Sequence, residues 1–87
     1  MTVEKFYSTA KKEGLTDFVI TSSNPGKLRG REVLSIGLAD FRVYSTDSGG
    51  SILVSTDNTY DNLESALDDL LKKCREHKKN KKEPVEV

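Results

Sequence analysis

The 87-residue sequence is poor in reactive side chains, with a single cysteine, Cys74, and a single histidine, His77. One cysteine excludes a disulfide within the chain, and one histidine beside it leaves too few ligands for a structural zinc site. A chain without disulfides is typical of a reducing compartment, so we expect the protein in the cytoplasm.

Long hydrophobic runs are also missing, because the longest apolar runs span three or four residues. A transmembrane helix needs about 20 apolar residues. The first residues do not form the apolar segment of a secretory signal. We therefore expect no contact with a membrane.

The few candidate catalytic residues do not form a recognisable set. His77 lies among lysines near the end of a predicted helix, and Cys74 lies on the apolar face of that helix without a third group to orient the pair. Asp68 and Asp69 are adjacent on the helix and point about 100° apart, so they are not a catalytic carboxylate pair. The glycines of the loop 24–31 lack the spacing of a phosphate-binding P-loop. We expect no enzymatic activity, no cofactor and no metal.

Two helices are predicted from apolar spacing and from capping residues. The first covers residues 3–13, with Thr2 as N-cap and Gly14 as the glycine that ends it. The second begins at Asp61, the expected N-cap, and continues to about His77. Its apolar stripe repeats at helical spacing and consists of Leu63, Ala66, Leu67, Leu70, Leu71 and Cys74.

Alternating apolar residues predict strands over residues 17–22, 32–46 and 51–56. Within residues 32–46 the phase of alternation changes near Gly37. Either a β-bulge between Gly37 and Asp40 absorbs one residue, which we prefer, or a tight turn divides the stretch into two strands. Residues 47–50 are a hairpin turn, and residues 57–60 are expected to connect the last strand to the second helix.

The predicted fold is therefore a small α+β domain in the order helix, three strands, helix. The strands form a three-stranded antiparallel sheet, with a fourth strand as the alternative, packed with the long C-terminal helix. One domain covers residues 1–78, and residues 79–87 form a disordered lysine-rich tail. The outer face of the sheet is expected to be mostly polar, with Val19, Leu53 and Leu34 as its apolar residues.

The charges suggest two binding surfaces. Residues before position 72 include eleven acidic and seven basic residues, whereas residues 72–82 include seven basic residues and one glutamate. In the main hypothesis an acidic face binds a partner protein together with the outer sheet face, through Asp57, Asp61, Glu64, Asp68 and Asp69. In the alternative, the basic loop 24–31 and the basic segment 72–82 contact nucleic acid, through Lys27, Arg29, Arg31, Lys72, Lys73, Arg75, Lys78 and Lys79. A second copy of the chain is a further candidate partner, because a core of this size is small.

The first 18 residues also resemble the N-termini of small accessory proteins of phages and mobile elements of Gram-positive bacteria. The resemblance consists of an M-T-V start, a helix with F-Y and A-K, and a following glycine; it covers Thr2, Val3, Phe6, Tyr7, Ala10, Lys11, Gly14 and Asp17. It implies a viral protein that acts in the host-cell cytoplasm. Proteins of this kind are often inhibitors of host machinery, including anti-CRISPR proteins.

Overall fold

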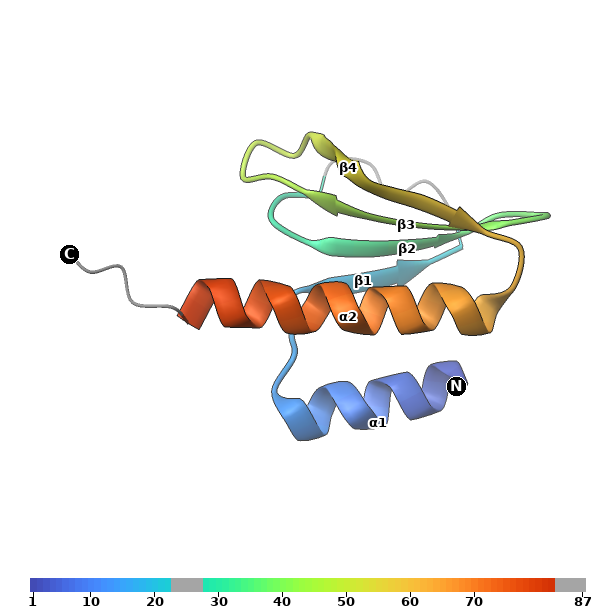
Figure 1. Ribbon diagram of the computed structural model, residues 1–87, viewed down its shortest axis with the longest axis horizontal. Coiled ribbons are helices and arrows are strands. Elements are labelled where there is room, and N and C mark those ends of the chain that lie inside the picture. Colours follow the sequence, from blue (N-terminus) through green and yellow to red (C-terminus); the bar gives the residue numbers. More distant parts are fainter. Residues whose placement is uncertain (23–27, 83–87) are drawn as a thin grey trace.

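Two helices cover one face of a four-stranded sheet (Figure 1). The computed structural model describes residues 1–22 and 28–82, with side chains up to residue 79. The elements are α1 Val3–Glu13, β1 Phe18–Thr21, β2 Glu32–Ile36, β3 Phe41–Thr46, β4 Ile52–Tyr60 and α2 Leu63–Lys82. The predicted α+β class is confirmed, with four strands between the two helices.

The ends of α1 follow the local sequence. Thr2 accepts a hydrogen bond from the Lys5 amide at its N-cap, and Gly14 takes the left-handed conformation, with φ of 71°, at its C-terminus. Both caps were predicted.

The two ends of α2 differ from the prediction. The N-cap is Asn62 and not Asp61, because the Asn62 side chain accepts a hydrogen bond of 2.8 Å from the Ser65 amide. Helix α2 continues to Lys82, beyond the predicted start of the tail at residue 79. No glycine or proline interrupts it before Pro84. Residues 83–87 of the predicted tail lie outside the described residues.

The sheet has the order β1-β2-β3-β4. Strands β2, β3 and β4 pair antiparallel as expected, whereas β1 pairs parallel to β2. Residues 37–40 form a tight turn, so the preferred bulge there is wrong. The Gly37 amide donates to the Asp40 carbonyl at 2.8 Å, and a Cβ atom at Gly37 would lie 2.8 Å from Asp40 Oδ1. A side chain at position 37 would force Asp40 to shift, so glycine suits this turn.

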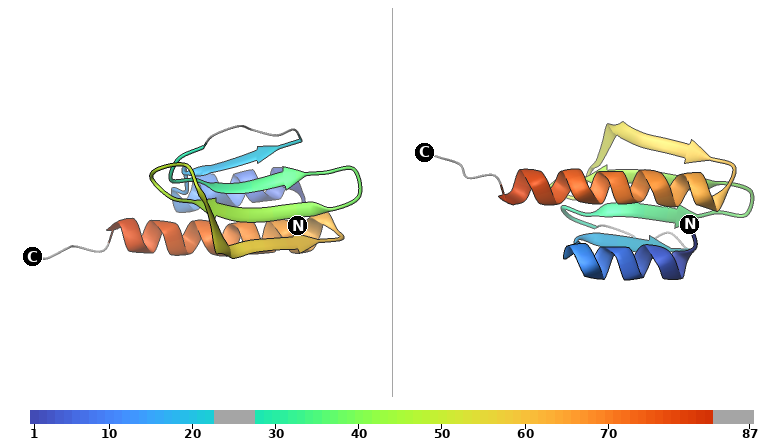
Figure 2. Two further views of the ribbon diagram at one scale, coloured as in Figure 1. Left: turned by 90° about the horizontal axis from the view of Figure 1, so that it is seen from above. Right: turned by 60° about the horizontal axis from the view of Figure 1, so that its bottom comes forward.

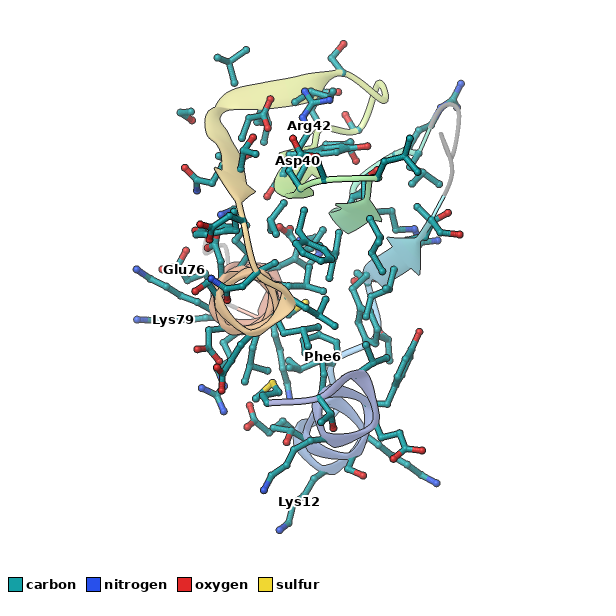
Figure 3. All side chains as sticks on the ribbon, turned by 90° about the vertical axis from the view of Figure 1, so that its right-hand side faces the viewer. Phe6, Lys12, Asp40, Arg42, Glu76 and Lys79 are labelled. Carbon is teal, nitrogen blue, oxygen red and sulfur yellow. The ribbon has the colours of Figure 1, made fainter. Side chains whose placement is uncertain are left out.

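The core lies between the sheet and α2, with α1 beneath β1 (Figure 2). Leu34 and Val43 are a cross-strand pair, and both are fully buried against the helices. The prediction of Leu34 on the outer face is therefore wrong, because the turn at residues 37–40 sets the phase of β2. Phe6 of α1 points toward the core (Figure 3). Its ring is edge-on to that of Phe18 at a centroid distance of 5.0 Å. This contact joins α1 to β1.

Candidate functional site

A groove of about 730 Å³ lies between β4 and α2. Its floor is the end of the inner sheet face, formed by Glu32 of β2 and Ser45 and Thr46 of β3. One wall is β4 and the other is α2. The wall residues are Leu53, Ser55, Thr56 and Asn58 on β4 and Asp69, Lys72, Lys73, Glu76 and His77 on α2.

An irregularity in β4 accompanies the groove. The pairing of β3 with β4 passes from Val43 opposite Asn58 to Ser45 opposite Leu53. Five residues along β4 therefore lie opposite two residues along β3. Strand β4 thus contains an insertion of three residues at this point. The Thr56 hydroxyl accepts the Ser45 amide at 2.9 Å, so a side chain replaces a backbone acceptor. The insertion also reverses the phase of β4, which places Leu53 in the groove and not on the outer sheet face as predicted.

The floor of the groove contains a buried polar cluster around Glu32. The Glu32 side chain is 7% exposed, and its two oxygens contact the Ser45 hydroxyl and His77 Nδ1, the latter at 2.9 Å. His77 Nε2 lies 3.2 Å from Asp17 Oδ2, and Arg31 donates to Asp17 Oδ1 at 3.1 Å. Both ring nitrogens of His77 therefore face carboxylate oxygens. Both can donate when the ring is protonated, so the cluster ties α2 to β2 and to the segment before β1.

The cluster does not have the geometry of a nucleophile and its base. In a serine or cysteine hydrolase the histidine contacts the nucleophile directly. Here Glu32 lies between Ser45 and His77, and both nitrogens of His77 are already engaged by carboxylates. Cys74 and His77 share the lining of a cavity of only about 110 Å³. Burial, with the charges of Glu32 and Asp17, raises the pKa of the Cys74 thiol to about 12, which keeps it protonated.

A second polar cluster, around Asp69, closes the opposite end of the groove. Asp69 accepts hydrogen bonds from Lys73 at 2.7 Å, from the Tyr60 hydroxyl at 2.7 Å and from Asn58 at 3.2 Å. Burial alone would raise the pKa of Asp69, but the hydrogen bonds from Lys73, Tyr60 and Asn58 outweigh it and hold the pKa below its ordinary value. The bond to Asp69, together with burial, raises the pKa of Tyr60 to about 12.

The five acidic residues predicted to bind a partner are spread over β4, the connection after it and α2, and three of them form ion pairs within the domain. Asp57 forms a two-pronged ion pair with Arg42, which holds the pKa of Asp57 below its ordinary value. Glu64 pairs with the N-terminal amine of Met1, and Asp69 pairs with Lys73. The other two members of the set, Asp61 and Asp68, are exposed.

Four of the eight cations predicted to contact nucleic acid are engaged within the domain. Arg31 pairs with Asp17, Lys73 with Asp69, and Arg75 with Glu13. The Lys78 ammonium donates to the Glu13 carbonyl oxygen. Lys27 lies outside the described residues. Within the described ones, Arg29, Lys72 and Lys79 are exposed and form no ion pair.

Exposed apolar side chains gather instead at the start of β4. Ile52, Leu53 and Val54 are 37%, 42% and 82% exposed. On the outer sheet face Val33 and Tyr44 are buried, and Arg42 lies 5.0 Å from the centre of the Tyr44 ring. The prediction of a mostly solvated outer face is therefore wrong at the centre of the sheet, where Val33 and Tyr44 are buried. The exposed apolar side chains of the sheet lie instead on its edge strand, β4.

Sequence reasoning did not find the cluster of Asp17, Glu32, Ser45 and His77. Its members lie on four separate segments, which only the tertiary fold brings together. One signal was present in the sequence. Glu32 has the same phase as Leu34 and Ile36, so it is a carboxylate on the apolar face of a strand.

No protein-family model, curated protein or solved structure matches this chain. Among the described residues, no helix is long and apolar enough to cross a membrane. The described side chains also form no group of three or more histidine, cysteine or acidic residues suited to a metal ion.

Proposed function

We propose that this chain is a small, non-enzymatic protein-binding domain, and that its contact surface is β4 with the adjoining groove. The observation that carries this proposal is the row of exposed apolar side chains, Ile52 to Val54, on the last strand of the sheet. An edge strand presents unpaired backbone groups, and proteins usually protect such edges with charges or prolines. An apolar edge strand is instead typical of a surface that pairs with another chain.

The N-terminal resemblance adds a narrower proposal. In it, the partner is a host protein in the cytoplasm of a bacterial cell, and the domain inhibits that protein by covering a working surface. A defence protein is one such target, in the manner of an anti-CRISPR protein. Two exposed carboxylates, Asp61 just before α2 and Asp68 on α2, would add contacts to a basic partner.

Nucleic-acid binding has less support. Four of the eight predicted cations already contact oxygen atoms of the domain, and Glu13, Asp17 and Asp69 lie beside them. Counterion release upon binding scales with the number of phosphates that free cations can neutralise. The described surface offers few of them close together.

A pull-down with two matched variants tests the proposal. Val54→Glu places a charge on β4, whereas Leu38→Glu places one in the turn at the other end of β3, where Leu38 is also fully exposed. Tagged wild-type protein and both variants would serve as baits in a bacterial lysate, after circular dichroism has confirmed their folding. We expect Leu38→Glu to capture the same partner as wild type and Val54→Glu to lose it.

Equal capture by both variants would contradict the proposal. So would a gel shift of DNA or RNA that persists in Val54→Glu and disappears when residues 78–87 are deleted. That second result would favour the nucleic-acid alternative.

A further inference from the structure

We propose that the groove takes an extended peptide segment of the partner, which adds to the free edge of β4 as a fifth strand and carries an acidic and a basic residue in the order acid–x–base. This inference rests on the proposed function and specifies the chemistry of the partner. Its three supports are the open edge of β4, the charges on the helical wall and the spacing between them.

The position of the groove suits strand addition. Strand β4 is the last in the sheet order, and no other strand of the described chain pairs with its outer edge. Helix α2 forms the opposite wall, so a peptide along β4 would lie between a strand and a helix. Main-chain hydrogen bonds supply the affinity in this mode of recognition, and side-chain contacts with the walls supply the specificity.

The helical wall offers two charges that the domain leaves unpaired. Lys72 and Glu76 line the groove and are exposed, and neither forms an ion pair among the described residues. Glu76 lies on the side of α2 nearer β4, whereas Lys79 points away from the domain (Figure 3). The other ionisable groups of the groove, on Asp69, Lys73, Glu32 and His77, contact one another within the two clusters.

The spacing of these charges fits an extended chain. Lys72 and Glu76 are four residues apart on the helix, a rise of about 6 Å. Alternate residues of a strand point to the same side and lie about 6.7 Å apart. An acidic side chain opposite Lys72 and a basic one opposite Glu76 are therefore separated by one residue in the peptide. The intervening side chain of the peptide points away from α2. Val54 is exposed and does not line the groove, so its apolar surface favours an apolar residue at that position of the peptide.

The direction of the peptide follows from the fold. Strand β4 and α2 are joined by a short connection and run in opposite directions (Figure 1). A peptide antiparallel to β4 therefore runs in the direction of α2, and it meets Lys72 before Glu76. Antiparallel pairing is the slightly more stable choice. The resulting order is acid–apolar–base from the N-terminus to the C-terminus.

Two synthetic peptides of equal composition test this proposal, acetyl-VEVKV-amide and acetyl-VKVEV-amide. Binding would be followed by NMR titration of the isotope-labelled protein. We expect shift changes in β4 and in the facing turns of α2, and a preference of about fivefold for the first peptide, the effect of two solvent-exposed ion pairs. The double variant Lys72→Glu/Glu76→Lys should reverse this preference. The remote charge swap Glu4→Lys/Lys5→Glu on α1 should leave it unchanged.

Three results would overturn the inference: an equal or opposite preference in the wild-type protein, a preference unaffected by the Lys72 and Glu76 swap, and no binding of either peptide up to about 1 mM. Concentration-dependent self-association through β4, seen by analytical ultracentrifugation, would also overturn it, since a second copy would then occupy the edge. The protein could show no preference between the peptides while Val54→Glu still abolishes capture of the partner. That combination would reject the peptide motif alone. The proposed function would then stand.

Discussion

Replacing His77 with alanine should destabilise the domain strongly, although the residue lies near the end of a helix and is partly exposed. The substitution removes one of two hydrogen bonds to the buried Glu32 carboxylate. A lost hydrogen bond to a buried charge costs about 1.5–3 kcal/mol. The contact with Asp17 adds little, because Asp17 is 22% exposed and keeps Arg31. We therefore expect a loss of about 2–3 kcal/mol, a large fraction of the stability of a domain this small.

Urea denaturation followed by circular dichroism would measure this loss. With an m-value of about 1 kcal/mol/M, the midpoint should fall by about 2–3 M. Adding Glu32→Gln to His77→Ala removes the unpaired charge, and the amide can still contact Ser45. The double variant should therefore recover at least half of the loss. Exposed Lys79→Ala is the matched control on the same helix and should cost less than about 0.5 kcal/mol. A loss from His77→Ala no larger than this control would refute the assigned role of the cluster.

Three further predictions concern other contacts. Asp69 has a lowered pKa in the folded state, so its contribution to stability is present above the ordinary aspartate value of 3.8 and is lost as the pH falls through the folded value; a urea series below about pH 4 should show this loss, and Asp69→Asn should weaken that pH dependence. Cys74 is 4% exposed and its pKa is raised to about 12, so a thiol reagent should label it at the rate of unfolding; rapid labelling of the native protein would contradict its burial. Gly14→Ala should cost about 1–2 kcal/mol in thermal or urea unfolding, because φ is +71° and the new Cβ would lie 3.2 Å from Lys78 Nζ; an unchanged stability would show that α1 ends differently.

The helices could be predicted from the sequence because their signals are local. The apolar stripe of α2 and the two caps of α1 depend on residues within a few positions of each other. The exact start of α2 could not be predicted in this way, since Asp61 and Asn62 are both suitable caps and only the backbone geometry selects Asn62.

The sheet was harder to predict because its contacts are distant in sequence. The phase change near Gly37 was visible, but a bulge and a turn give the same pattern. The hydrogen bond from the Gly37 amide to the Asp40 carbonyl, which closes the connection between β2 and β3, shows that this segment is a turn. Residues 57–60 lack strong strand formers apart from Thr59 and Tyr60, yet β4 continues through them because Asp57 pairs with Arg42 and Asn58 with Asp69.

The candidate site shows the same limit. The sequence predicted Lys72 as a binding residue, but as part of a cationic surface that contacts nucleic acid. Its place on a groove wall depends on the insertion in β4, which no local signal revealed. The exposed apolar row of β4 was visible in the sequence as part of an ordinary strand. Only the sheet order shows that this strand is an edge.

Site-specific photo-crosslinking tests the central claim most directly. A photoreactive amino acid would replace Val54 in one version of the protein and Leu38 in another, since both side chains are highly exposed and lie at opposite ends of the sheet. In a bacterial lysate we predict a covalent adduct with one partner protein from position 54 and none from position 38. An adduct from position 38 alone, or only with nucleic acid, would contradict the assignment of β4 as the binding surface.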